Sequence, residues 1–166
     1  MRSRMTIGIM ALATVWLVSA GGGAASARAA TTCTWGGTPV APTGWTTNSP
    51  GLTNFPSPGP VKFYAIGDLA GDAGCSGKFS FTGQVDAGSS CGFVSFHGTA
   101  KGLPGVARFA GVSALGLAPA RLYDRAGEIV GSENAQFLNN APFTACNTPQ
   151  GFTEGTFSSV IELIDR

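Results

Sequence analysis

Glu133 is the acidic residue whose position in the sequence most favours a chemical role. It lies in an alternating segment, where it shares a face with Ile129, Gly131, Ala135 and Phe137. A carboxylate that points into such an apolar interior needs a cationic partner, or it stays protonated. We therefore interpret Glu133 as a candidate ligand-pocket residue.

Two arginines are candidate partners for this carboxyl group. Arg108 and Arg121 lie in neighbouring strand-like segments, and either one could pair with Glu133 inside a pocket. A β-bulge at Gly127, or one further along, would shift the alternation by one residue and place Glu133 in water. The sequence leaves both arrangements open.

Nucleophilic catalysis has little support in this sequence. Residues 88–92 (GSSCG) match the G-x-S-x-G pattern, in which a strand-to-helix turn exposes the serine. An alternating segment follows the match here, which predicts a hairpin turn instead. His97, the single histidine, alternates with Ser95 and Thr99, and we expect it to face solvent. We predict no catalytic residue and no enzymatic activity.

A metal or cofactor site is equally poorly supported. Asp68 and Asp72 form a doublet on one loop, but Ala70 stands where an EF-hand-like loop needs an oxygen ligand. The cysteines form no C-x-x-C pair, which disfavours structural zinc. We predict that the protein holds no metal and needs no cofactor.

Trp35, Trp45 and Phe55 stand among Thr, Gly and Pro residues in the segment 30–60. Exposed aromatic side chains in such a segment can stack on sugars or anchor a partner protein. We therefore regard all three as candidate surface aromatics. The alternative is that they close one end of the fold, held there by a disulfide bridge at Cys33.

The four cysteines are Cys33, Cys75, Cys91 and Cys146, an even number that predicts two disulfides in an exported chain. Residues 78–85 and 93–99 alternate on either side of a turn, so Cys75 and Cys91 would lie about 30 Å apart along a hairpin. That distance disfavours their pairing. We favour Cys33–Cys75 with Cys91–Cys146, and the pairing of Cys33–Cys91 with Cys75–Cys146 stays open.

The first 29 residues have the form of a secretory signal peptide. Arg2 and Arg4 precede an uncharged run over 7–20, and residues 27–29 (ARA) have the small-x-small form of a cleavage site. The apolar run is shorter than the roughly 20 residues of a membrane span. Without these 29 residues, seven Lys and Arg face nine Asp and Glu, and the net charge changes from +1 to −2.

Composition and turn spacing predict an all-β domain. Only 11 % of the residues are charged, which disfavours a coiled coil and nucleic-acid binding. Short strand-like segments separated by Gly-bearing turns indicate a small antiparallel meander barrel of about eight strands, with a two-sheet β-sandwich as the alternative. We expect strands near 44–48 and at 61–67, 78–85, 92–100, 105–113, 117–123, 128–138 and 155–163. Residues 30–60 then form an N-terminal segment of the domain, and 61–166 form its core.

Three stretches of the chain carry a resemblance to known proteins. They are TCTWGGTP at 32–39, KGLPGVARF at 101–109 and LYDRAGEIVGSENAQ at 122–136. With the Ala- and Gly-rich export signal, they resemble small secreted proteins of actinomycete-type bacteria. The resemblance extends over nearly all of the chain after residue 29. It implies an extracellular location, and it implies no catalytic residues because that group has no established activity.

Together these features predict a secreted, disulfide-bridged β-domain that binds an extracellular ligand or protein. We expect no nucleic-acid partner and no membrane span after cleavage of the signal. Two alternatives stay open. One is a protease inhibitor that presents the Pro-rich loop at 54–60, and the other is a hydrolase-like enzyme that uses acidic pocket residues such as Glu133.

Overall fold

The structure is a computed structural model that describes residues 30–137 and 144–164. Every secondary-structure element that lies wholly within these residues is a β-strand. The strands are β1 (Thr31–Trp35), β2 (Gly37–Thr38), β3 (Ala41–Pro42), β4 (Gly44–Leu52), β5 (Val61–Gly71), β6 (Gly77–Val85), β7 (Val94–Lys101), β8 (Arg108–Ser113), β9 (Leu117–Tyr123), β10 (Ile129–Gln136) and β11 (Phe152–Leu163).

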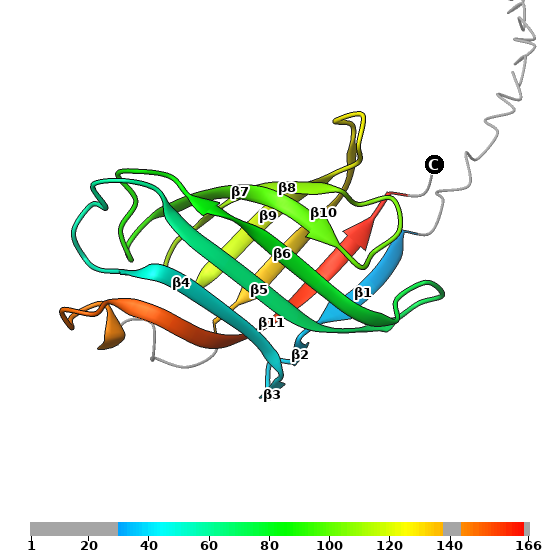
Figure 1. The fold of residues 1–166 in the computed structure, drawn as a ribbon. Coiled ribbons are helices and arrows are strands. Elements are labelled where there is room, and N and C mark those ends of the chain that lie inside the picture. Colours follow the sequence, from blue (N-terminus) through cyan, green and yellow to red (C-terminus); the bar gives the residue numbers. More distant parts are fainter. Residues whose placement is uncertain (1–29, 138–143, 165–166) are drawn as a thin grey trace, which may run out of the picture.

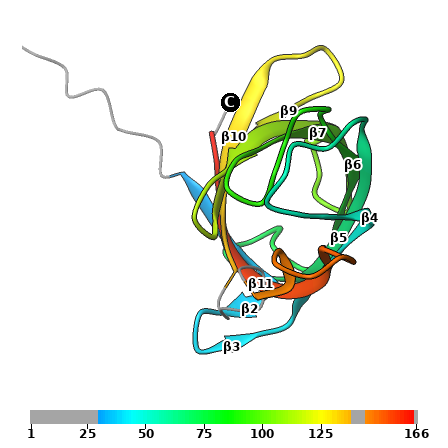
Figure 2. The same cartoon turned by 90° about the vertical axis from the view of Figure 1, so that its left-hand side faces the viewer.

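Eight antiparallel strand positions, which we call staves, form the wall of a closed barrel (Figures 1 and 2). Each strand from β4 to β11 pairs with the next along the chain, and β11 pairs back with β4. The fold is therefore the meander barrel predicted from the turn spacing, and the sandwich alternative is wrong. Closure leaves no free edge along the wall, because β4 is bonded on both sides.

One stave is built from two strands. β1 and β4 both lie between β5 and β11, with β1 paired to 69–71 and 159–163 and β4 to 62–66 and 152–157. Between them the β2–β3 hairpin loops out of the wall. Gly36 makes this possible, since its φ is +76° and a Cβ there would lie 2.7 Å from the Cα of Gly44. Its carbonyl accepts hydrogen bonds from the N–H groups of Thr43 and Gly44, which rejoin the stave.

This arrangement differs from the expected division at residue 60. Residues 30–60 supply a whole stave of the barrel, rather than a segment that accompanies a core formed by 61–166. Pro, Gly and Thr conceal the alternation in β4, where Gly44, Thr46 and Asn48 point inward. The later strands agree with the expected positions to within a few residues, although β11 begins at Phe152, ahead of the expected 155.

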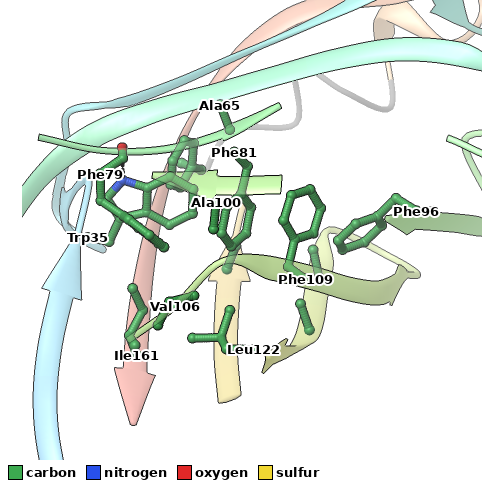
Figure 3. Close-up of a cluster of buried hydrophobic side chains, with 14 of the residues drawn as sticks. Trp35, Ala65, Phe79, Phe81, Phe96, Ala100, Val106, Phe109, Leu122 and Ile161 are labelled. Atoms are coloured by element: carbon green, nitrogen blue, oxygen red, sulfur yellow. Dashed lines mark hydrogen bonds between the residues drawn. The ribbon is translucent and has the colours of Figure 1, made fainter. Parts of the chain in front are cut away.

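Side chains fill the half of the barrel in which β1 lies (Figure 3). Trp35 lies at its centre, with ring centroids 5.0 Å from Phe79 and 4.6 Å from Phe157. Its indole N–H donates to the carbonyl oxygen of Phe79 at 2.9 Å. Phe81 stacks on Phe109 at 3.9 Å. Edge-to-face and stacked contacts of this kind stabilise a pair beyond the area they bury.

Inward-facing glycines make room for these rings. A Cβ on Gly98 would lie 2.9 Å from the ring of Phe109, and one on Gly111 would lie 2.8 Å from the ring of Phe96. The missing side chains at these two positions therefore let rings from neighbouring strands fill the lumen.

Two disulfides brace opposite ends of the barrel. Cys33–Cys75 joins β1 to the β5–β6 loop with a Cα–Cα distance of 5.4 Å. Cys91–Cys146 joins the β6–β7 loop to the segment before β11, with a Cα–Cα distance of 6.1 Å. This is the favoured one of the two pairings that the hairpin geometry leaves open. Two bridges of this kind fit an oxidising, extracellular location.

The predicted signal peptide at 1–29 lies outside the described residues. In the part of the chain that the structure describes, no helix has the length and apolar character needed to cross a membrane.

The β8–β9 turn contains a strained residue. Leu115 has a φ of +52°, followed by Gly116 at +83°, and Ala114 and Leu117 exchange two backbone hydrogen bonds around them. This is the geometry of a two-residue hairpin turn, whose first position favours Asn over a branched residue. The Leu115 side chain is 79 % exposed, so it recovers little energy by burial.

We therefore expect Leu115→Asn to raise the free energy of unfolding by about 0.5–1 kcal/mol, because asparagine tolerates positive φ. Urea denaturation followed by circular dichroism measures the change. Leu117→Asn, at an exposed position within β9, is the matched control and should give no gain. A loss of stability in L115N would show that the leucine makes contacts worth more than its strain.

Candidate functional site

A cavity of about 100 Å³ occupies the half of the barrel that side chains leave unfilled. Trp35, Phe81 and Phe157 form part of its lining, so it begins where the packed half ends. At the other end it reaches Cys91 and Cys146. The apolar lining also includes Leu52, Phe63, Val85, Val94, Phe96, Ala118, Ala135, Phe137 and Phe152. A mostly apolar cavity with a few polar groups is the usual form of a small-molecule site.

Glu133 is the acidic residue of this lining. Its side chain is only 2 % exposed, and it projects inward from the middle of β10. Its neighbours across the sheet are Ala120 on β9 and Ile161 on β11. The hydroxyl of Ser159, one inward position along β11, donates a hydrogen bond to Oε1 of Glu133. The small side chain of Ala120 leaves space for the carboxyl group.

A β-bulge lies near the start of β10, before Glu133. The register of β10 on β9 shifts between Ile129 and Gly131, so that Ile129 faces outward and Val130 is buried. Because the bulge lies before Glu133, it turns the side chain of Ile129 to the outer face and leaves Glu133 on the inner face. The expectation that Ile129 shares the inner face is therefore wrong, whereas Gly131 and Ala135 do share it.

Burial controls the ionisation of Glu133. Loss of water around the carboxylate raises the pKa of Glu133 from 4.5 to about 8, and the hydrogen bond from Ser159 opposes this rise in part. Ala120 and Ile161 on the flanking strands carry no charge that could compensate an anion. At neutral pH the group is therefore mainly a neutral carboxylic acid.

Asn48 is a second polar group of the lining. It points inward from β4, and no hydrogen bond to its amide comes from the residues that the structure describes. Thr46, its neighbour on the same face, is already bonded, because its hydroxyl donates to the carbonyl oxygen of Tyr64 at 3.0 Å. Asn48 lines the cavity, so its side-chain amide is accessible to a molecule there.

Three segments meet over the cavity, and we call them the cap. They are 53–60, 86–93 and 144–151. Backbone N–H groups of Cys91 and Ser57 donate to Thr53 at 2.7 Å and to Ser89 at 2.8 Å, and Asn54 donates to the carbonyl oxygen of Cys146 at 3.3 Å. The Cys91–Cys146 bridge adds a covalent link between two of the segments. The cap therefore holds that end of the barrel in a defined shape.

The prediction that Arg108 or Arg121 pairs with Glu133 is wrong. Arg108 on β8 and Arg121 on β9 are both exposed on the outer face of the wall. Their inward-facing neighbours along these strands are Phe109, Ala120 and Leu122. Strand alternation accounts for the difference, because each arginine stands one residue away from an inward position.

The three aromatic candidates separate into two groups. Trp35 is 1 % exposed and belongs to the core, so its assignment to the surface is wrong, and the alternative that it fills the fold beside the Cys33 bridge is correct. Trp45, on the outer face of β4, is 42 % exposed, and Phe55 in the cap is 79 % exposed. The structure does not bring these two together with Trp35.

His97 takes part in a polar cluster on the outer wall. Its Nδ1 lies 3.1 Å from Oδ1 of Asp86, and the hydroxyl of Ser95 donates to Oδ2 of Asp86 at 2.6 Å. The amide of Gln84 lies 3.1 Å from Nε2. The imidazole therefore faces an amide instead of a nucleophile. Ser90 of the GSSCG match forms a tight turn with Phe93, as expected for a hairpin.

Sequence reasoning did not identify Ser159 or Asn48. Inward alternation in β11 could have indicated Ser159, whose neighbours on the same face are Phe157 and Ile161.

Within the described residues, no group of three or more His, Cys, Asp or Glu side chains could hold a metal ion. Asp68 instead pairs with Lys78 at 2.8 Å, and Asp72 accepts the backbone N–H of Thr32.

Comparisons of this chain with family models, curated proteins and solved structures find no match.

Proposed function

We propose that this protein is a secreted binding protein whose barrel cavity holds a small, largely apolar molecule. The observation that carries the proposal is a pair of buried polar groups, the Glu133 carboxyl and the Asn48 amide, that line one apolar cavity. Described protein groups offer Glu133 only the Ser159 hydroxyl and offer Asn48 no side-chain hydrogen bond. A bound molecule with polar atoms would complete these hydrogen bonds.

The size of the cavity limits the ligand. An apolar cavity of about 150 Å³ holds benzene, so one of about 100 Å³ suits a molecule smaller than benzene, with about four non-hydrogen atoms. Phe63, Phe96 and Phe137 would contact such a molecule through their ring faces and edges.

Binding fits the site better than hydrolysis does. Glycoside hydrolysis uses two carboxyl groups on either side of the scissile bond. Glu133 is the one acid of the cavity lining among the residues described. A single acid that is neutral at pH 7 can anchor a ligand with one hydrogen bond, and we propose that the protein binds its ligand without transforming it.

2-Methylpropane, with four carbon atoms, is a suitable first probe, and Trp35 can report its binding. Replacing Trp16 and Trp45 by Phe leaves Trp35, which lines the cavity, as the sole tryptophan. We expect the fluorescence of Trp35 to change saturably as 2-methylpropane is added. A flat titration would contradict the proposed function.

A substitution that fills the cavity should remove this response. Ala118 points inward from β9 and lines the cavity, so Ala118→Leu adds three carbon atoms in the space of the ligand. We expect A118L to weaken 2-methylpropane binding at least tenfold while the far-UV circular dichroism is retained. Ala70→Leu, on an exposed position of β5, is the matched control and should bind as the parent does.

A further inference from the structure

The orientation of the Glu133–Ser159 hydrogen bond indicates which polar group a ligand should carry. With the Ser159 hydroxyl as the donor to Oε1 of Glu133, the acidic proton of the neutral carboxyl group lies on Oε2, the oxygen that Ser159 leaves free. Glu133 lines the cavity, so a molecule there can accept a hydrogen bond from this proton.

We propose that the cavity selects molecules with a neutral hydrogen-bond acceptor, such as a carbonyl oxygen, and that protonated Glu133 donates the hydrogen bond. This inference rests on the proposed binding function and adds the chemical class of the ligand. The Asn48 amide, which lines the same cavity, offers N–H donors that are suited to the same class.

The surroundings of Glu133 favour a neutral acceptor over a cation. An amine would have to lose its hydration and bind as an ion pair within an apolar lining, and few additional polar groups are there to share the charge. Thr46, which faces inward from β4, already donates its hydroxyl proton to the Tyr64 carbonyl. The residues that face Glu133 from β9 and β11 are Ala120, Ile161 and Ser159, which carry no charge.

Three probes of one size separate the two classes. Acetone carries a neutral acceptor, propan-2-amine carries a cation, and 2-methylpropane carries neither. At pH 6 we expect the wild-type protein to bind acetone about tenfold more tightly than 2-methylpropane, the typical gain from one satisfied buried hydrogen bond. Propan-2-amine should bind most weakly of the three.

Two variants at Glu133 test the source of the preference. Glu133→Gln keeps an acceptor for Ser159 and an N–H donor for the cavity, so it should retain the preference for acetone at pH 6 and at pH 9.5. Glu133→Met removes the donor, so it should bind acetone and 2-methylpropane equally. The wild-type protein should lose its preference at pH 9.5, where burial no longer keeps the carboxyl group neutral and its pKa of about 8 is exceeded.

The outcomes distinguish this inference from the binding function. Equal affinities of the wild-type protein for acetone and 2-methylpropane at pH 6 would overturn the inference and leave the binding function standing. A preference for propan-2-amine at pH 6 would also overturn it, in favour of a cation site. Binding of no probe to any variant would overturn both proposals.

Discussion

Between pH 5 and pH 9 the wild-type protein is expected to lose about 4 kcal/mol more of its free energy of unfolding than the Glu133→Gln variant does. The cause is the buried carboxyl group, whose pKa rises from 4.5 to about 8 in the folded protein. Over this interval the folded state keeps a proton that the unfolded chain releases. Because the unfolded state binds fewer protons, stability falls as the pH rises. Glutamine cannot ionise and contributes no such slope.

Urea denaturation at a series of pH values measures this difference. The wild-type and E133Q curves should diverge from about pH 5 upward, and the divergence should level off above about pH 8, where folded Glu133 also ionises. Glu162→Gln removes an exposed carboxyl group from β11 and is the matched control. Its curve should follow the wild type, since folding does not strip water from an exposed charge. Parallel wild-type and E133Q curves would show that Glu133 is hydrated in the folded protein.

The second large effect is expected at Trp35. Trp35→Ala should cost about 4–5 kcal/mol, because it removes a fully buried indole that contacts three phenylalanine rings. It also leaves the carbonyl oxygen of Phe79 without its donor. Since a domain of this size is stable by about 5–15 kcal/mol, W35A should lie close to unfolding.

Trp45 supplies the comparison for this experiment. Trp45→Ala removes the same side chain from the outer face of β4, where it is 42 % exposed, and should cost about 1 kcal/mol or less. Circular dichroism in urea follows both variants without relying on tryptophan fluorescence. Equal losses in W35A and W45A would contradict the placement of Trp35 in the core. Trp35→Phe, which keeps a ring but loses the N–H donor, should fall between them.

Much of the fold could be predicted from the sequence because strand alternation and turn chemistry act locally. Phe79, Phe81 and Val85 alternate with polar residues, and Gly88 marks the following turn, so β6 and its hairpin are evident without a structure. The same hairpin sets a distance between Cys75 and Cys91 that excludes their pairing. Two pairings remain after this step, and the structure shows that Cys33–Cys75 with Cys91–Cys146 is the one formed.

The candidate site was less accessible to such reasoning, because it depends on which strands lie next to each other. Alternation placed Glu133 on an apolar face, but it could not exclude a bulge that reverses that face. Arg108 and Arg121 are close in sequence to inward positions, and only the register shows that they point outward. Ser159 lies 26 residues from Glu133, so barrel closure had to bring β10 beside β11 before the hydrogen bond could be recognised.

The sequence by itself determined the strands after residue 60, most of the turns and an even set of cysteines, since each depends on residues a few positions apart. It also placed Glu133 on an apolar face. Only the tertiary structure decided that residues 30–60 complete the barrel wall, that Trp35 fills one half of the lumen, and that the other half stays open around Glu133. The physical reason is that an interior volume depends on side chains from all eight staves at once. Burial of the carboxyl group, and with it the rise of its pKa, exists only when the barrel is closed.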